Sequence, residues 1–227
     1  MSCSVFITGT DTGIGKTTCS AALLVALRGS GLRAVGMKPV ASGCRETALG
    51  LRNDDAELLL EHGEPGIDYA LVNPYAFAAP IAPSIAAADA GTAIELDILR
   101  SAFATLARHN DVVVVEGVGG WAAPLSATLM QADLVRELRL PVILVVGLRL
   151  GCINHAVLSA RAIVADGCEL LGWIANTIDP QMLRIEENLA ALKKLLPAPC
   201  LGRLPTQNPA DPIALASELD DAVRTLA

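Results

Sequence analysis

The stretch GTDTGIGKTT, residues 9–18, decides the fold of this 227-residue chain. It joins a short apolar run at 5–8 to an amphipathic pattern at 17–28, which predicts a buried strand, a glycine-rich loop and a helix in that order. Glycines let backbone amides converge on an anion, and a helix N-terminus adds its positive dipole end. Lys16 would reach the outer phosphates of a nucleotide, and the Thr17 hydroxyl would bind its Mg²⁺. The stretch therefore predicts a phosphate-binding loop.

The loop departs from the usual motif at one position. Thr10 stands where the first glycine of the motif is expected, and Gly9 lies one residue early. The alternative interpretation is a glycine-rich strand-to-helix turn with a solvated lysine. The place of Gly15, Lys16 and Thr17 between a buried strand and a helix favours phosphate binding.

Further apolar runs lie at 34–37, 112–115, 142–146 and 170–175. Three of the five runs are apolar throughout, which is typical of parallel strands covered on both faces. Helical patterns at 54–61, 94–108, 130–138, 153–166, 182–195 and 213–226 alternate with them. The alternation predicts an α/β fold, a doubly wound and mostly parallel sheet flanked by helices, in a single domain over residues 1–227. Residues 63–91, which hold four of the thirteen prolines, are expected to form an irregular insertion near a binding cleft.

Composition excludes several classes of protein. With 52% hydrophobic residues the chain can bury a substantial core, and its net charge of −7 argues against nonspecific nucleic-acid binding. No apolar stretch reaches the roughly 18 residues of a membrane-spanning helix, and no signal segment is recognisable at the N-terminus. The six cysteines are scattered, without a CxxC pair. These features predict a cytoplasmic protein with reduced thiols and no membrane partner.

Several charged residues lie at the ends of predicted strands or at the start of a predicted helix, where a ligand-binding cleft is expected. Glu116 ends the run of four valines, and Lys38 follows the second strand and precedes a proline turn. The carboxyl ends of parallel strands line the ligand-binding crevice, so both side chains are candidates for a nucleotide site. Asp54 and Asp55 open a helix, where they could either cap it or bind a metal. The residues themselves leave that choice open.

Seven blocks resemble the dethiobiotin synthetase family, ATP-dependent enzymes of biotin biosynthesis within the P-loop NTPase superfamily. They run in family order from residue 5 to about residue 207. They are GTDTGIGKT at 9–17, GMKPVASG at 36–43, NPY at 73–75, VEGVGGW at 115–121, PVILVVG at 141–147, GCINH at 151–155 and GWIAN at 172–176.

The resemblance implies a ligase reaction in which 7,8-diaminononanoate, CO₂ and ATP give dethiobiotin, ADP and phosphate. An amine captures CO₂ as a carbamate, the carbamate takes the γ-phosphoryl group as a carbamic-phosphoric anhydride, and the second amine closes the ring. Lys16 and Lys38 are implied as catalytic: Lys16 contacts carbamate and γ-phosphate, and Lys38 holds the carbamate. Positive charge is needed because two unit charges 4 Å apart interact by roughly 4 kcal/mol at an effective dielectric near 20.

The same resemblance implies the remaining site residues. Mg²⁺ is assigned to Thr17, Asp55 and Glu116, which selects Asp55 over Asp54. The substrate is assigned to Thr12 and Ser42, and its carboxylate to the helix start of the neighbouring subunit in a homodimer, at Gly151, Cys152, Ile153 and Asn154. Asn176 is implied to read adenine. The nucleotide contacts are Gly13, Ile14, Gly15, Lys16, Thr17, Thr18, Asp55, Glu116, Gly117, Val118, Gly119, Asn176, Thr177, Pro205, Thr206 and Gln207.

Two other functions share this fold class. One is an ATPase switch of the plasmid-partition or division-site type, which carries a second lysine where this chain has Asp11. The other is an amide ligase for cobalamin precursors, which would normally need an ammonia-supplying domain for which 227 residues leave no room. The match over several blocks favours the synthetase.

Overall fold

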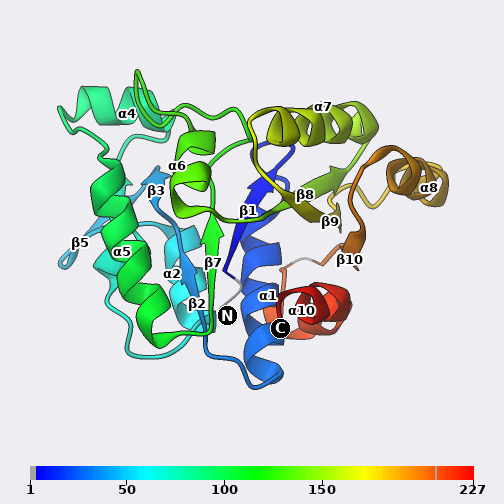
Figure 1. The fold of residues 1–227 in the computed structure, drawn as a ribbon, viewed down its shortest axis with the longest axis horizontal. Helices are drawn as coiled ribbons and strands as arrows, with labels where there is room; N and C mark the ends of the chain where they lie inside the picture. Colours follow the sequence, from blue (N-terminus) through cyan, green and yellow to red (C-terminus); the bar gives the residue numbers. More distant parts are fainter. Residues whose placement is uncertain (1–3, 208) are drawn as a thin grey trace.

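The central sheet is built around β1 (Val5–Gly9), which lies between β7 (Val112–Glu116) and β8 (Val142–Leu148). The computed structural model describes residues 4–207 and 209–227. The sheet also contains β2 (Ala34–Met37), β9 (Leu170–Thr177) and β10 (Cys200–Leu204), in the order β10-β9-β8-β1-β7-β2. All neighbouring strands in it are parallel (Figure 1). The prediction of an α/β fold with a parallel sheet is confirmed.

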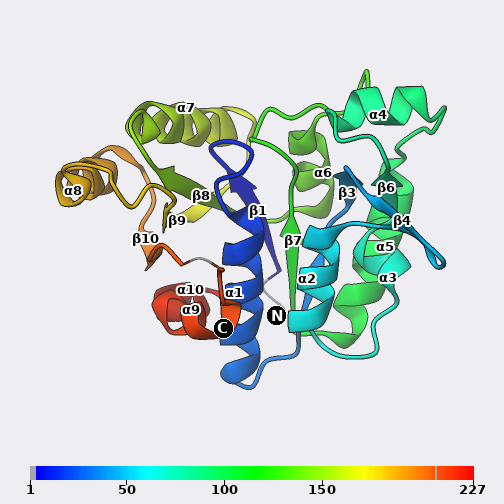
Figure 2. The same ribbon diagram turned by 180° about the vertical axis from the view of Figure 1, so that it is seen from behind.

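Helices cover both faces of this sheet, as the continuous apolar runs require. Val112 and Val114 pack on the face covered by α1 (Lys16–Gly29) and α2 (Asp54–His62), while Val113 and Val115 face the other layer. That layer contains α5 (Leu96–His109), α6 (Gln131–Leu138), α7 (Cys152–Ala165) and α8 (Ile185–Leu195). Figure 2 shows α1 in front of β1, with α2 beside it. Burying each valine contributes about 1.5–3 kcal/mol relative to leaving it exposed.

The prediction of an irregular segment at 63–91 was wrong in part. It contains α3 (Tyr69–Val72), β6 (Tyr75–Phe77) and α4 (Pro83–Asp89), and β6 pairs in parallel with β3 (Val40–Ser42). A hairpin of β4 (Arg45–Thr47) and β5 (Gly50–Arg52) lies between β3 and α2 in the chain. The strands β3 to β6 and the helix α3 are too short for hydrophobic periodicity to reveal them, because three or four residues span barely one repeat of either pattern.

The C-terminal part of the chain also differs from the prediction. β10 was not predicted, since Gly202 and Arg203 interrupt its apolar run. Instead of one helix over 213–226, the chain forms α9 (Pro212–Leu215), a 3₁₀ turn η1 (Ala216–Leu219) and α10 (Asp220–Leu226). The η1 backbone packs directly on β10, where a Cβ on Gly202 would lie 2.5 Å from the Glu218 carbonyl oxygen. One of the six cysteines, Cys3, lies outside the described part of the chain.

No helix among the described residues has both the length and the apolar composition needed to cross a membrane.

Candidate active site

The phosphate loop joins β1 to α1 and depends on two glycines in the left-handed region. Gly13 has φ +72° and Gly15 has φ +83°, conformations that residues with a Cβ rarely adopt. Asn176, at the end of β9, donates from Nδ2 to the Ile14 carbonyl at 2.8 Å. A Cβ on Gly15 would lie 2.1 Å from that nitrogen. The predicted adenine reader therefore also packs on the phosphate loop, and a side chain at position 15 would have to displace its amide.

Lys16, the first residue of α1, is 7% exposed and points back into the loop. Its Nζ donates to the Asp11 carbonyl at 2.9 Å, and no carboxylate pairs with it among the described residues. Burial, followed by the charge of Lys38, lowers the pKa of Lys16 to about 8. Its ammonium is thus poorly neutralised by the protein, as expected for a group that awaits an anionic ligand.

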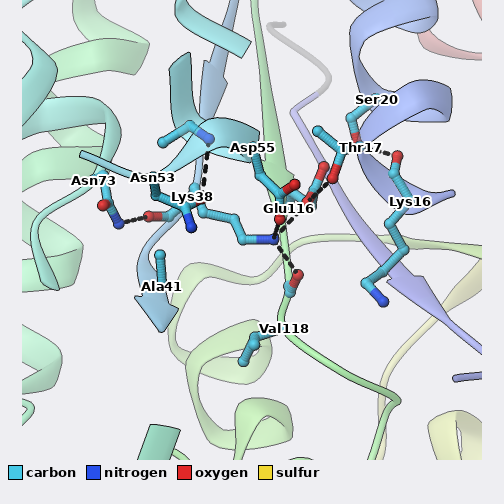
Figure 3. Close-up of polar contacts among 12 residues, drawn as sticks. Lys16, Thr17, Ser20, Lys38, Ala41, Asn53, Asp55, Asn73, Glu116 and Val118 are labelled. Atoms are coloured by element: carbon cyan, nitrogen blue, oxygen red, sulfur yellow. Dashed lines mark hydrogen bonds and ion pairs between the residues drawn. The ribbon is translucent and has the colours of Figure 1, made fainter. Parts of the chain in front are cut away.

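Lys38 follows β2 and lies at the centre of the site (Figure 3). Its Nζ donates to Glu116 Oε1 at 2.5 Å, to Asp55 Oδ2 at 2.9 Å and to the Gly117 carbonyl at 3.2 Å. These bonds use all three donors of an ammonium group. Burial opposes the charge, but Glu116 and Asp55 outweigh it and raise the pKa of Lys38. Lys38 is therefore protonated and contacts two of the three predicted metal ligands.

Glu116 ends β7 with a fully buried side chain. Besides the bond from Lys38, its Oε1 accepts a hydrogen bond from the Thr17 hydroxyl at 2.9 Å. Its Oε2 is buried and has no hydrogen-bond partner among the described residues. An unpartnered buried carboxylate oxygen is costly in a folded protein, so this atom marks a place where a ligand would bind.

The structure also separates the two adjacent aspartates that open α2. Asp55 faces Lys38, whereas the Asp54 side chain is 89% exposed and pairs with Arg45 at 3.5 Å. Although burial favours the neutral form of Asp55, the Lys38 charge lowers its pKa. Asp55 is therefore an ionised member of the site, and Asp54 lies outside it.

A series of hydrogen-bonded side chains that the sequence did not reveal supports the segments that carry Lys38 and Asp55. The Asn73 amide donates to the carbonyls of Lys38 at 2.7 Å and Tyr75 at 3.1 Å. The Tyr69 hydroxyl donates to Asn73 Oδ1 at 3.2 Å and accepts from the backbone N–H of Asn53 at 2.8 Å. Asn53 in turn caps α2. The NPY block contained the signal, but its partners could not be identified without the fold.

The predicted substrate residues lie on three separate segments: the phosphate loop, the end of β3 and the start of α7. Thr12 is exposed on the phosphate loop, and a Cβ on Gly119 would lie 3.7 Å from its hydroxyl. Ser42 ends β3 and is partly buried. Arg149 pairs with Asp11 at 2.6 Å and so connects the phosphate loop to the segment before α7. That helix begins at Cys152, which is buried, while Gly151 and Asn154 are exposed and Ile153 is partly buried.

The later nucleotide residues lie beyond β9 and β10. The Thr206 hydroxyl donates to the Thr177 carbonyl at 2.7 Å, which joins the two segments next to Asn176. Gln207 Oε1 accepts from the Asp211 amide at 3.0 Å, and Pro205 is exposed. Asp211 caps α9 through the Ile213 amide. Asn208 lies outside the described residues.

Comparison with protein families and sequences gives a consistent result. A family model described as an AAA domain matches residues 4–214. A protein of Xanthomonas euvesicatoria named ATP-dependent dethiobiotin synthetase BioD is 62% identical over 214 residues, 94% of this chain and 96% of its own length. A protein of the same name from Xylella fastidiosa strain 9a5c is 59% identical over 221 residues, 96% of this chain and 98% of its own.

Solved structures share the fold at low sequence identity. A chain of the MinC:MinD cell division complex of Aquifex aeolicus has a TM-score of 0.64 at 16% identity, covering 99% of this chain and 95% of that one. A ParA family ATPase from Chlorobium tepidum has a TM-score of 0.59 at 13% identity, covering 97% of this chain and 98% of that one. At such identities the likeness shows the fold alone and does not support the switch function.

The lowered pKa of Lys16 predicts proton uptake when ADP binds. At pH 8.5 a group with a pKa of about 8 is mostly neutral, and phosphates stabilise its charged form, so about 0.7 proton should be taken up. At pH 6.5 Lys16 is already charged, and its uptake should be close to zero. Titration calorimetry in buffers of different ionisation enthalpy measures this difference.

The Lys16→Arg variant is the control, because a guanidinium does not titrate in this range. Its uptake at pH 8.5, where the ADP phosphates are fully ionised, should fall close to zero. Equal uptake by the parent at the two pH values would contradict the assignment of Lys16 to the phosphates.

Proposed function

This chain belongs to the ATP-dependent dethiobiotin synthetase family, and on that basis we propose that it joins 7,8-diaminononanoate and CO₂ at the expense of ATP. The observation that carries the proposal is the pair of buried lysines at the carboxyl ends of β1 and β2, Lys16 and Lys38. The reaction brings an anionic carbamate to an anionic phosphate, and this protein of net charge −7 buries two cationic side chains there, of which Lys16 has no carboxylate partner among the described residues.

The proposed chemistry has three steps. One amine attacks CO₂, forming a C–N bond and losing a proton, to give a carbamate. A carbamate oxygen attacks the γ-phosphorus, the bond to ADP breaks, and a carbamic-phosphoric anhydride forms. The second amine attacks the carbonyl carbon and loses a proton, the C–O bond to phosphate breaks, and the ureido ring closes as phosphate leaves.

The protein's own groups support positioning and charge stabilisation for these steps. We assign Lys16 and the amides of the phosphate loop to the outer phosphates, and Lys38 to the carbamate. Asn73 holds the main-chain carbonyl of Lys38 in the turn after β2, and Glu116, Asp55 and the Gly117 carbonyl fix the ammonium, which would exchange one of these partners for the carbamate. Its raised pKa keeps it charged at neutral pH, as stabilisation of a carbamate requires.

The residues at the centre of the site fit a magnesium ion. Thr17, Asp55 and Glu116 offer the oxygen ligands that Mg²⁺ prefers, and the buried Glu116 Oε2 lacks a partner among the described residues. When bound, the ion would supply positive charge near the transferring phosphoryl group. Since Lys38 now contacts both carboxylates, a bound cation would share them with it.

We also propose a homodimer with the substrate site at the subunit interface. Leu150 is 95% exposed and Leu158 is 56% exposed, an apolar surface that a partner would cover. Asn154 and Leu158 share one face of α7 at helical spacing, beside the helix start assigned to the substrate carboxylate.

A cytoplasmic location agrees with the described cysteines, which are all free thiols.

The product assay tests the function directly. Incubation with the diamine, ¹³C-bicarbonate and MgATP should give dethiobiotin labelled at the ureido carbon, in step with ADP, by mass spectrometry. With ¹⁸O-labelled CO₂, the released phosphate should contain one oxygen from CO₂, because a carbamate oxygen attacks phosphorus. ATP hydrolysis without dethiobiotin, or hydrolysis stimulated by DNA or lipid vesicles, would instead support the switch function.

A second prediction concerns Lys38→Met, which should lower kcat for dethiobiotin by about 100-fold or more while ADP still binds. The substitution also leaves Glu116 without its cation, at a cost of about 3–5 kcal/mol in stability. Turnover should therefore be measured below the unfolding midpoint, with the folded fraction followed by circular dichroism. Lys193→Met, at an exposed lysine on α8, is the matched control and should behave as the parent. A kcat for Lys38→Met within threefold of the parent would remove Lys38 from the mechanism.

The dimer is tested by Leu158→Glu, which places a charge on the proposed interface and should shift the protein toward monomer in sedimentation velocity. Leu183→Glu changes a residue that is 83% exposed outside α7 and should leave the assembly unchanged. A parent protein that sediments as a monomer at assay concentration would overturn the dimer proposal.

A further inference from the structure

A buried amide, Gln131, holds the loop that follows Glu116. Gln131 is the first residue of α6 and is 1% exposed. Its Oε1 accepts a hydrogen bond from the Val118 amide at 2.8 Å. Its Nε2 donates to the Gly120 carbonyl at 3.2 Å and to the Thr8 hydroxyl at 3.3 Å. A single side chain thus connects β1 to two points of the loop 117–120.

The loop 117–120 is enclosed on both sides. A Cβ on Gly117 would lie 2.4 Å from Gln131 Oε1 and 2.8 Å from the ring of Phe6. On the other side, a Cβ on Gly120 would lie 3.5 Å from the Gly9 carbonyl at the start of the phosphate loop. Gln131 therefore fixes how closely this loop lies against the phosphate loop.

The groups that Gln131 holds adjoin the reacting centre. Gly117 carries the carbonyl that accepts from Lys38 Nζ at 3.2 Å, and it directly follows Glu116. The Val118 N–H that Gln131 accepts from belongs to the same peptide group as this carbonyl, so a rotation of that peptide would shift the carbonyl and hence the ammonium that donates to it. A single peptide group, between Gly117 and Val118, thus separates the Gln131 side chain from the Lys38 ammonium.

Only a side chain with both an acceptor and donors satisfies this loop. A carboxylate at position 131 would accept from the Val118 amide but could not donate to the Gly120 carbonyl. An apolar side chain of the same length would leave both backbone groups without their partner. The hydrogen bonds to the loop therefore require a side-chain amide at position 131.

We propose that Gln131 is a positioning residue, which orients the loop 117–120 and through its Gly117 carbonyl Lys38 for phosphoryl transfer. The assignment rests on the proposed function, because the step it serves is phosphorylation of the carbamate. Gln131 does not touch the reacting atoms, so its loss should slow the chemical step more than it weakens binding.

The test compares Gln131→Met with the parent under saturating diamine, bicarbonate and MgATP. We expect kcat for dethiobiotin to fall at least tenfold, while KM for each substrate and the Kd for ADP change by less than threefold. Gln131→Glu, which keeps the length and the acceptor but loses the donors, should lower kcat at least fivefold. Basal MgATP hydrolysis without the diamine should fall in parallel, which gives a readout independent of the substrate's identity.

Asn110→Ala is the matched control for a purely structural effect. Asn110 is 7% exposed, and its amide donates to the Leu106 carbonyl at 2.7 Å, beyond the end of α5 and before β7 begins. This variant should lose thermal stability but keep kcat within twofold of the parent.

Three outcomes would overturn the assignment of Gln131. The first is an unchanged kcat in the Gln131 variants, the second is an equal loss of kcat in Asn110→Ala, and the third is failure of both Gln131 variants to fold. A parent that hydrolyses MgATP but makes no dethiobiotin would refute the proposed function alone, and hydrolysis would still decide the role of Gln131.

Discussion

A buried carboxylate sets the constraint on which the site depends. Glu116 has no exposed surface, and an ionised carboxylate in such a place must be paired and hydrogen-bonded to be tolerated. Lys38 and Thr17 supply that compensation from two other segments of the chain. The turn after β2, the start of α1 and the end of β7 must therefore meet at one point. The all-apolar strands then form the rigid support from which these three segments emerge.

The two buried lysines differ because their surroundings differ. Lys38 is enclosed by two carboxylates and a carbonyl, so its charge is compensated within the protein and its pKa is raised. Lys16 has a carbonyl oxygen and a neighbouring cation, so burial and repulsion lower its pKa. One lysine is thus part of a completed network, whereas the other lacks an anionic partner. Lys16 is therefore the buried cation that can take an incoming anion without giving up an ion pair, whereas Lys38 would have to exchange a partner.

Much of the architecture follows from local sequence patterns, whereas the contacts between segments do not. The run of valines before Glu116 and the glycines before Lys16 were enough to predict a parallel sheet with a phosphate loop at its edge. The partners of Lys38 could not be predicted, because Asp55 and Glu116 lie 17 and 78 residues away. The β3–β6 pair was missed because strands of three residues leave no periodic signal. Gln131 gave no signal, since a lone amide at a helix start resembles an ordinary surface residue.

Two glycines of the site owe their identity to amide side chains that come from elsewhere in the chain. Asn176 fills the space beside Gly15, and Gln131 fills the space beside Gly117. A residue with a Cβ at either position would have to displace the amide that crowds it, and at Gly15 the left-handed φ adds a second constraint. At position 117, where the backbone shows no left-handed φ, a larger residue becomes admissible only after Gln131 has shortened and the Phe6 ring has shifted. The order of substitutions, and not only their sum, would then decide which descendants of this sequence remain viable.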